Sequence, residues 1–282
     1  LSSVRAVEVS GNQAFFTNND DLWVSDGTPS GTIQLTFGSP LVSSLNLLGT
    51  TNRLHFNAME ASTGTEPWIS DGSTTTILAD IVPGSSSSNP SAYTVLNSQV
   101  IFEANNQLWS TDGSSIANLN SPVSIDQCCF VSPSRGIAYF TSINGSGGID
   151  LWVTNGTATG HQRITSLTNS VGGIATWFRD VNGTMFFSAP TPTNGNELWF
   201  SDGSSAGFID IIPGANGSGP EELVNLDGTL VFAAQNPAAG RELWRSNGTI
   251  GSTVMIRDIN PGPDDSFPDH LTAIDGLVYM DV

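Results

Sequence analysis

The chain has no lysine, and its positive charge is confined to eight arginines against 26 acidic residues. The formal net charge at pH 7 is therefore −18. A surface of this sign repels the phosphate backbone of nucleic acids and the anionic headgroups of membranes. We expect no nucleic-acid partner, and we interpret the acidity as favouring solubility in a secreted or high-salt setting.

Long apolar runs are also missing, since no stretch approaches the roughly 18 residues of a membrane helix. Direct membrane insertion is therefore not expected. Cysteine is scarce: Cys128 and Cys129 stand side by side, which excludes a disulfide framework across the fold. Three states stay open for this pair, namely two free thiols, a strained vicinal disulfide in a turn, or a bond to another chain.

Tryptophan, in contrast, recurs at a regular interval. Six tryptophans lie 41 to 47 residues apart, each preceded by Leu or Pro and followed by a Ser/Thr-Asp/Asn-Gly turn. They are Trp23, Trp68, Trp109, Trp152, Trp199 and Trp244. An aromatic residue stands 7 or 12 positions before each of them. A gap with only two values predicts two fixed strands that are joined by a hairpin loop of variable length.

The sixth repeat shows the complete pattern. The runs ELVNL and TLVFAA flank Asp227-Gly228, and the runs ELWRS and TVMIRDI flank Asn247-Gly248. Asp-Gly and Asn-Gly are strong hairpin signals because both of their residues adopt positive φ. Four short antiparallel strands in roughly 40–45 residues are typical of one blade of a β-propeller.

We therefore predict an all-β fold, a β-propeller of four-stranded antiparallel blades, with six complete repeats plus a half blade and most simply a seven-bladed ring. One domain, residues 1–282, would have blades at about 3–40, 41–84, 91–122, 126–168, 174–214 and 221–262 and a partial blade at 269–282. A string of small β-sandwiches is the alternative. The half blade leads us to expect that its outer strands come from a longer polypeptide or, by strand addition, from a neighbouring subunit.

Small residues two positions after the recurring aromatic fall on the same face as it and would let neighbouring blades approach closely. They are Ala58, Ala104, Ala189 and Ala234. Tyr139 and Tyr279, at or beside the recurring aromatic position, are expected in the core.

The recurring segment resembles the ELWxxDGT repeat family, whose motif reads ELWFSDG at residues 197–203. The fuller family pattern, with GTxxGT and a closing DIxPG, is matched at residues 26–32, 209–214 and 257–262. Pro67 departs from it, as do Asn155 and Asn247, and the third repeat lacks a clear fourth strand. The resemblance implies a secreted or cell-surface repeat protein and no defined catalysis.

The turn after each tryptophan is also similar to the Asp-box of sialidase-type propellers. We expect its aspartates to cap backbone N–H groups while the following glycine takes positive φ, which is a structural role. The aspartates are Asp26, Asp71, Asp112 and Asp202.

Candidates for catalysis and for metal binding are few. Glycoside hydrolysis needs paired carboxylates or a tyrosine with an arginine cluster, and a carboxylate repeated in every turn is a poor candidate. His55, His161 and His270 lack zinc-ligand spacing. Asp264, Asp265 and Asp269 form a weak calcium candidate, against a plain solvent loop. We expect no cofactor and no catalysis.

Five Asn-Gly-Ser/Thr triplets fit the acceptor pattern for N-glycosylation, and all fall in predicted turns or loops. They begin at Asn144, Asn155, Asn182, Asn216 and Asn247. In a eukaryotic source we expect at least two of these asparagines to carry a glycan.

The leading functional interpretation is a non-catalytic, extracellular or cell-surface module of an adhesion, matrix or filament glycoprotein. Its partners would be other copies of itself or other extracellular proteins or glycans. The alternatives are a carbohydrate- or protein-binding module attached to an extracellular enzyme, and a polysaccharide-degrading enzyme. Trp177, outside the repeat register, could stack on a ligand, but packing within its strand is the expectation we favour.

Overall fold

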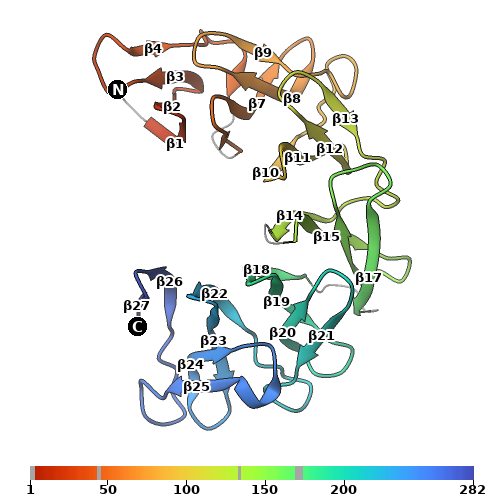
Figure 1. Ribbon diagram of the computed structural model, residues 1–282, viewed down its shortest axis with the longest axis vertical. Coiled ribbons are helices and arrows are strands. Elements are labelled where there is room, and N and C mark those ends of the chain that lie inside the picture. The colour runs from red at the N-terminus through yellow and green to blue at the C-terminus, as the bar shows by residue number, and fades with distance from the viewer. Residues whose placement is uncertain (1–3, 43–45, 133–134, 169–173) are drawn as a thin grey trace. The chain divides into compact units, whose positions relative to one another are not determined.

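The computed structural model describes residues 4–42, 46–132, 135–168 and 174–282 (Figure 1). Within these residues every regular element is a β-strand except one 3₁₀ turn, η1 (Ile250–Ser252). The chain divides into two compact units, residues 1–129 with 156–160 and residues 130–155 with 161–282, which are described separately. None of the described segments is a helix of the length and hydropathy that a membrane span requires.

The N-terminal part of the chain forms three antiparallel sheets. Their strands are β1 (Val4–Ser10), β2 (Gln13–Asn18), β3 (Asp21–Ser25) and β4 (Thr32–Gln34); β5 (Leu41–Val42), β6 (Leu48–Gly49), β7 (Leu54–Glu60), β8 (Gly64–Ser70) and β9 (Thr75–Ile77); and β10 (Ser91–Leu96), β11 (Gln99–Ala104), β12 (Gln107–Thr111) and β13 (Ile116–Asn118). In the second sheet, the two short strands β5 and β6 both pair with β7 in the place of one first strand.

Three more four-stranded sheets and one two-stranded sheet follow. Their strands are β14 (Gln127–Ser132), β15 (Ile137–Ile143), β16 (Ile149–Thr154) and β17 (His161–Thr168); β18 (Thr176–Val181), β19 (Thr184–Pro190), β20 (Asn196–Ser201) and β21 (Ala206–Ile209); β22 (Glu221–Leu226), β23 (Thr229–Asn236), β24 (Gly240–Ser246) and β25 (Val254–Arg257); and β26 (Asp269–Ile274) and β27 (Leu277–Asp281).

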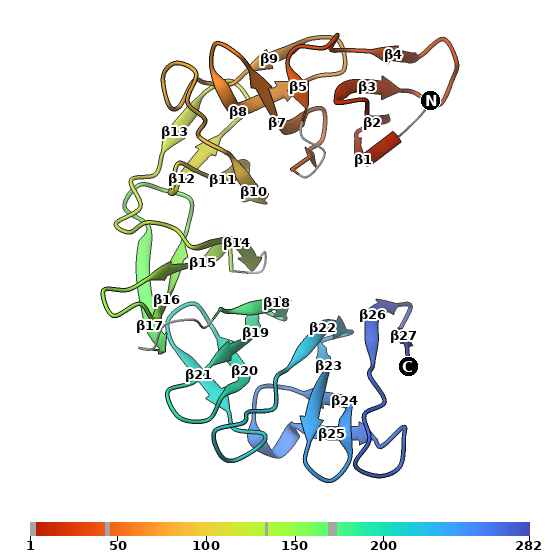
Figure 2. The ribbon, with the colours of Figure 1, turned by 180° about the vertical axis from the view of Figure 1, so that it is seen from behind.

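In each four-stranded sheet, consecutive strands are neighbours, so the repeat folds as an up-and-down meander, and the five-stranded sheet follows the same order except that β5 and β6 both pair with β7. Within the second unit, the first strands of successive sheets contact one another, β18 with β22 and β22 with β26 (Figure 2). Repeated four-stranded sheets that meet at their first strands make a β-propeller. The all-β propeller fold is thus as predicted, whereas the number of blades in a complete ring stays a prediction.

The strand register confirms the relation between the two sequence markers. In all six complete repeats the recurring aromatic is the direct cross-strand partner of the tryptophan. The pairs are Phe16–Trp23, Phe56–Trp68, Phe102–Trp109, Phe140–Trp152, Phe187–Trp199 and Phe232–Trp244. Large side chains opposite each other on one face stabilise a strand pair, so the pairing fixes the register of each hairpin.

The hairpin between the two markers varies in length, as the two gaps predicted. In the first and third repeats it is a two-residue turn, Asn19-Asp20 or Asn105-Asn106, with positive φ at both residues. That conformation defines a type I′ turn, whose twist matches that of the flanking strands. The other four complete repeats have a longer connection at the same place.

The structure modifies three sequence-based expectations. The third repeat has a fourth strand, β13, and is complete. Tyr139 is buried as expected, but the expectation for Tyr279 is wrong, because its side chain is 57% exposed on β27. Cys128 and Cys129 fall in strand β14 rather than in a turn, and their side chains lie outside the described residues, as does any bond between them.

Replacing a recurring aromatic should destabilise the fold strongly. Phe232 is fully buried between Leu230 and Ala234, among residues of the core of the second unit. We expect Phe232→Ala to lower the free energy of unfolding by about 3–5 kcal/mol, measured by urea denaturation, since it leaves a cavity. Phe37→Ala is the control, because Phe37 is 76% exposed. A loss for Phe232→Ala no larger than for the control would contradict the assigned core.

Candidate functional site

The four turn aspartates, Asp26, Asp71, Asp112 and Asp202, act as caps; the first three are exposed and Asp202 is partly buried. The Oδ1 atom of each accepts a hydrogen bond from the backbone N–H two residues further on, at 2.8–2.9 Å. The glycine after each aspartate has positive φ. The expected structural role is therefore confirmed for this turn.

These hydrogen bonds favour the ionised carboxylate. Backbone and side-chain donors of Ser114, with those of Ser115, lower the pKa of Asp112 to about 2. The pKa values of Asp26, Asp71 and Asp202 are lowered in the same way by donors in their own turns. A carboxylate held in its ionised form by turn donors is not suited to deliver a proton near neutral pH.

A second set of carboxylates lies two residues before the tryptophan, where sequence reasoning assigned no role. Glu66, Glu197 and Glu242 have side chains with no exposed surface. They stand on third strands in the second, fifth and sixth repeats. A buried carboxylate is costly unless its oxygens receive hydrogen bonds, so the partners of these three decide their role.

Glu197 shows the arrangement in full. Its Oε2 accepts hydrogen bonds from the backbone N–H of Ile211 at 3.1 Å and from the hydroxyl of Ser218 at 2.6 Å. Its Oε1 accepts the backbone N–H of Ser218 at 3.1 Å. Both partners belong to the connection between the fifth and sixth repeats. One side chain thus holds the segment that leads from one sheet to the next.

The other two glutamates hold their connections through equivalent donors. Glu66 accepts the N–H of Ile81 at 3.0 Å, and Glu242 accepts the N–H of Ile259 at 2.9 Å. A serine hydroxyl adds a bond in each case, from Ser88 at 2.6 Å and from Ser266 at 2.8 Å. We call these three arrangements the carboxylate clamps.

The sequence contained a signal for the clamps. A glutamate two positions before the tryptophan occurs only in the three repeats that end in Pro-Gly. The isoleucine that donates its N–H to the glutamate lies two residues before that proline in each of them. Co-occurrence within a repeat could therefore have linked the glutamate to the connection.

A glycine in the hairpin beside each clamp permits the close approach. Gly64, Gly195 and Gly240 have positive φ, and a Cβ atom on any of them would lie within 3.0 Å of connection backbone. The nearest atoms are the carbonyl oxygens of Ser86 and Asp264, at 2.5 Å, for Gly64 and Gly240. Only glycine combines this φ with the absence of a side chain.

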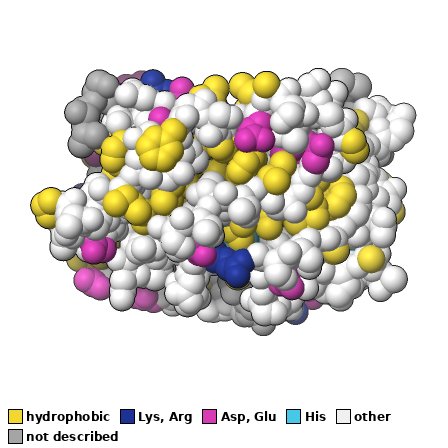
Figure 3. All heavy atoms as spheres, turned by 90° about the horizontal axis from the view of Figure 1, so that it is seen from above, with side chains coloured by type: hydrophobic (Ala, Val, Ile, Leu, Met, Phe, Trp, Pro, Cys, Tyr) yellow, Lys and Arg dark blue, Asp and Glu magenta, His cyan; other side chains and the backbone are white. Residues whose placement is uncertain are grey.

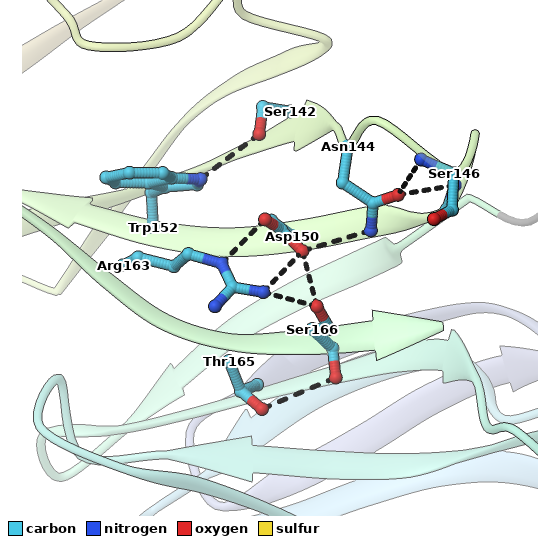
Figure 4. Close-up of polar contacts among 9 residues, drawn as sticks. Ser142, Asn144, Ser146, Asp150, Trp152, Arg163, Thr165 and Ser166 are labelled. Atoms are coloured by element: carbon cyan, nitrogen blue, oxygen red, sulfur yellow. Dashed lines mark hydrogen bonds and ion pairs between the residues drawn. The ribbon is translucent and has the colours of Figure 1, made fainter. Parts of the chain in front are cut away.

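Repeats without the glutamate use other polar side chains at the same position. In the fourth repeat Asp150 forms an ion pair with Arg163 at 2.6 Å and accepts hydrogen bonds from Ser166 and Asn144, at 2.6 and 3.1 Å (Figure 4). Burial would raise the pKa of Asp150, but these donors lower it below its usual value. In the first repeat Asp21 accepts the N–H of Gly38 at 2.6 Å.

No cluster suited to metal binding is formed by the described histidines, cysteines and acidic residues. Asp264, Asp265 and Asp269, the calcium candidate, lie close in sequence but belong to no such group among the described residues. Asp265 instead accepts the backbone N–H of Arg241 at 2.7 Å. The histidines lie on separate strands, and burial, followed by the charge of Arg53, lowers the pKa of His55 to about 4.

A cavity of about 390 Å³ in the first unit is lined by Arg53, His55, Gln99 and Asp112, among other residues. Arg53 donates to the carbonyl oxygen of Gly113. The Oδ1 of Asp112 accepts the backbone N–H of Ser114 in its own turn, so this carboxylate in the lining is engaged in a structural hydrogen bond.

The glycosylation candidates lie where the sequence placed them, in turns or connections. The side chains of Asn155, Asn182, Asn216 and Asn247 are exposed. Asn144 is partly buried, and its amide nitrogen donates to Asp150. The four exposed asparagines are therefore better placed to carry a glycan than Asn144.

The expectation that Trp177 packs within its strand is wrong. Its indole is 43% exposed and stacks on no other ring among the described residues. The next residue, Phe178, takes the core position instead and stacks on Phe130 and Phe187, with ring centroids 3.8 and 4.8 Å apart. Trp177 is therefore available to a ligand.

The clamps should contribute to stability through their hydrogen-bond pattern. In Glu197→Gln one oxygen becomes an NH₂ group that faces a donor. We expect a loss of about 1–3 kcal/mol in the free energy of unfolding, measured by urea denaturation. Burial raises the pKa of Glu197 in the folded protein. The contribution of this side chain to the free energy of unfolding therefore falls as the pH rises from the usual glutamate pKa through the raised one, because ionising the buried carboxyl is costly. Glu60→Gln, outside the clamps, is the control, and equal losses in the two variants would contradict the clamp.

From the depressed pKa values of the turn aspartates, we expect part of the free energy of unfolding to be lost in acid. Because their folded pKa values are depressed, their contribution is present above pH ~4 and is lost as the pH falls toward 2. We expect Asp112→Asn to lose less stability than the wild type between about pH 5 and about pH 2.5, measured by urea denaturation at each pH. Asp275→Asn is the control, since no described donor reaches that carboxylate. An unchanged pH dependence in Asp112→Asn would contradict this account.

No family model and no curated protein matches the chain. Among solved structures, it is similar to a chain from a structural and mechanistic study of two prolyl endopeptidases (10% identity, TM-score 0.54, 98% of this chain and 45% of that chain). It is also similar to a puromycin-hydrolysing peptidase of Mycobacterium tuberculosis (11% identity, TM-score 0.50, 99% and 57%). A further match is the β-propeller domain of the Trilobed protease from Pyrococcus furiosus (11% identity, TM-score 0.48, 90% and 84%). The chain spans about half the length of the first two proteins. At these identities the likeness shows the fold alone.

Proposed function

We propose that the chain is a non-catalytic β-propeller module of an extracellular or cell-surface glycoprotein, with a role in adhesion, in a matrix or in a filament. The observation that carries the proposal is the engagement of the recurring carboxylates. The glutamates clamp connections between sheets and the aspartates cap turns, so the acidic groups that repeat through the fold act as structural groups.

The surface supports the same proposal. Exposed acidic side chains are widely spread over the face shown in Figure 3, where basic ones are sparse. The absence of lysine and the four exposed acceptor asparagines agree with an extracellular setting. The ELWxxDGT resemblance remains an expectation that points the same way.

We propose that a further strand pairs with β27, supplied by a longer polypeptide that contains this chain or, by strand addition, by a neighbouring subunit. Strand β27 pairs with β26 and has no second neighbour among the described strands. Leu277 and Tyr279 are each 57% exposed on it. In the complete sheets a third strand covers this position and places a tryptophan opposite the aromatic. A partner strand with that pattern would cover Tyr279.

A binding module attached to an extracellular enzyme is the second candidate, and the exposed indole of Trp177 favours it. A polysaccharide-degrading enzyme is a weaker candidate, because it needs a pair of free carboxylates at one place.

The test combines electron microscopy of the protein from its native source, glycan mapping by mass spectrometry and turnover assays on polysaccharides and peptides. We expect assemblies, glycans on at least two of the four exposed asparagines, and no product above the buffer level. Turnover that is lost on replacing acidic residues outside the clamps and turns would overturn the proposal. Material that stays monomeric and unglycosylated in its native source would also contradict it.

A further inference from the structure

The first strands of the sheets share a strained position. In five sheets the pairing of the first strand shifts at a bulge, and the residue there has positive φ although it is not glycine. These residues are Ala6, Ala92, Trp177, Glu222 and His270, with φ between 34° and 59°. Such a conformation is unfavourable for a residue other than glycine and is often found at binding sites.

The three bulge residues of the second unit are Trp177, Glu222 and His270, which we call the inner row. Contacts between successive first strands tie them together. Arg179 Nε donates to the carbonyl oxygen of Leu223 at 2.9 Å, which joins β18 to β22. The N–H of Leu271 donates to Oε2 of Glu222 at 3.0 Å, which joins β22 to β26. The three side chains therefore occupy equivalent positions on neighbouring strands.

The inner row offers an apolar plate and polar groups. The indole of Trp177 is half exposed. Glu222 uses Oε2 for Leu271, and no hydrogen bond from a described residue reaches its Oε1. The side chain of His270 is 77% exposed. An exposed aromatic face and hydrogen-bonding groups at equivalent positions of neighbouring first strands suit a ring with one apolar face and a rim of hydroxyls.

The charges near the row favour a neutral ligand. Glu221 is paired with Arg241 at 2.9 Å, and the imidazole of His270 lies 3.6 and 3.3 Å from Asp269 and Asp281. Glu221, Asp269 and Asp281 thus have partners of their own, which makes them poor sites for a cationic ligand. Their negative charges, together with that of Glu222, would repel an anionic ligand. The free oxygen of Glu222 remains as an acceptor for hydroxyl groups.

We propose that the inner row binds a neutral pyranose residue of a glycan, with the sugar ring stacked on Trp177 and its hydroxyls donating to Oε1 of Glu222. This inference rests on the proposed function and adds a ligand class to it. The sugar could belong to a glycan on another copy of this chain or to a separate polysaccharide.

The test is an NMR titration of the intact chain with neutral trisaccharides of glucose, mannose and N-acetylglucosamine. The indole N–H resonance of Trp177 is assigned with Trp177→Phe. We expect a saturable shift of this resonance with at least one trisaccharide. Trp177→Ala should weaken the affinity about tenfold, the value of one lost stacking contact. Because Trp177 is half exposed, this variant should keep the wild-type unfolding midpoint.

Two further variants sharpen the test. Glu222→Gln keeps an acceptor for Leu271 and should weaken the affinity, whereas Glu8→Gln should leave it unchanged. Glu8 is the matched control, because it also accepts an N–H from a neighbouring first strand, that of Gly49 at 3.1 Å. Phe267→Ala, at another exposed aromatic residue of the second unit, should also have no effect.

The outcomes separate this inference from the proposed function. No saturable shift, equal affinity in Trp177→Ala, or a shift produced only by a lysine peptide or a uronic acid would overturn the inference and leave the proposed function standing. A sugar that binds and is then cleaved would overturn the proposed function instead. Enzymatic removal of the chain's own glycans distinguishes the two sources, since a shift of the Trp177 resonance that a second, glycosylated copy produces is lost on deglycosylation only if the ligand is a glycan of that copy.

Discussion

The buried carboxylate two residues before the tryptophan connects the repeats of this protein. Each complete repeat is a four-stranded meander that must be joined to the next by an irregular segment whose backbone groups need partners. In three repeats a glutamate with no exposed surface receives N–H groups of that segment. Two or three hydrogen bonds offset part of the cost of burying the charge, and they hold the segment to the third strand.

The third strand therefore has two functions. Its tryptophan packs opposite the aromatic of the second strand and fixes the register of the hairpin. The residue two positions earlier points to the same side of the strand and binds the connection. Where Asp150 or Asp21 stands in place of the glutamate, the shorter side chain accepts hydrogen bonds from different donors. Variation at this one position thus accompanies variation between the repeats.

The sequence predicted the features that depend on contacts within one repeat. The spacing of aromatic and tryptophan predicted the hairpins and their variable loops, and the structure adds that these two residues are direct cross-strand partners. The turn aspartates were interpreted correctly since their partners lie two residues away. The clamps join residues 14 to 24 positions apart, so their partners were missed. Trp177 and Tyr279 were assigned to the core because strand alternation does not reveal a bulge or an uncovered edge.

The Asn-Gly turns have a consequence for the chemical ageing of the protein. Asparagine followed by glycine is prone to deamidation, because the following N–H is little shielded by a side chain. At Asn247 the amide oxygen accepts the hydroxyl of Thr249 at 3.1 Å, as the carboxylate does in the sister turns. Hydrolysis to aspartate would create the residue that four other repeats already use, whereas isoaspartate would displace the cap. An attached glycan would block both products.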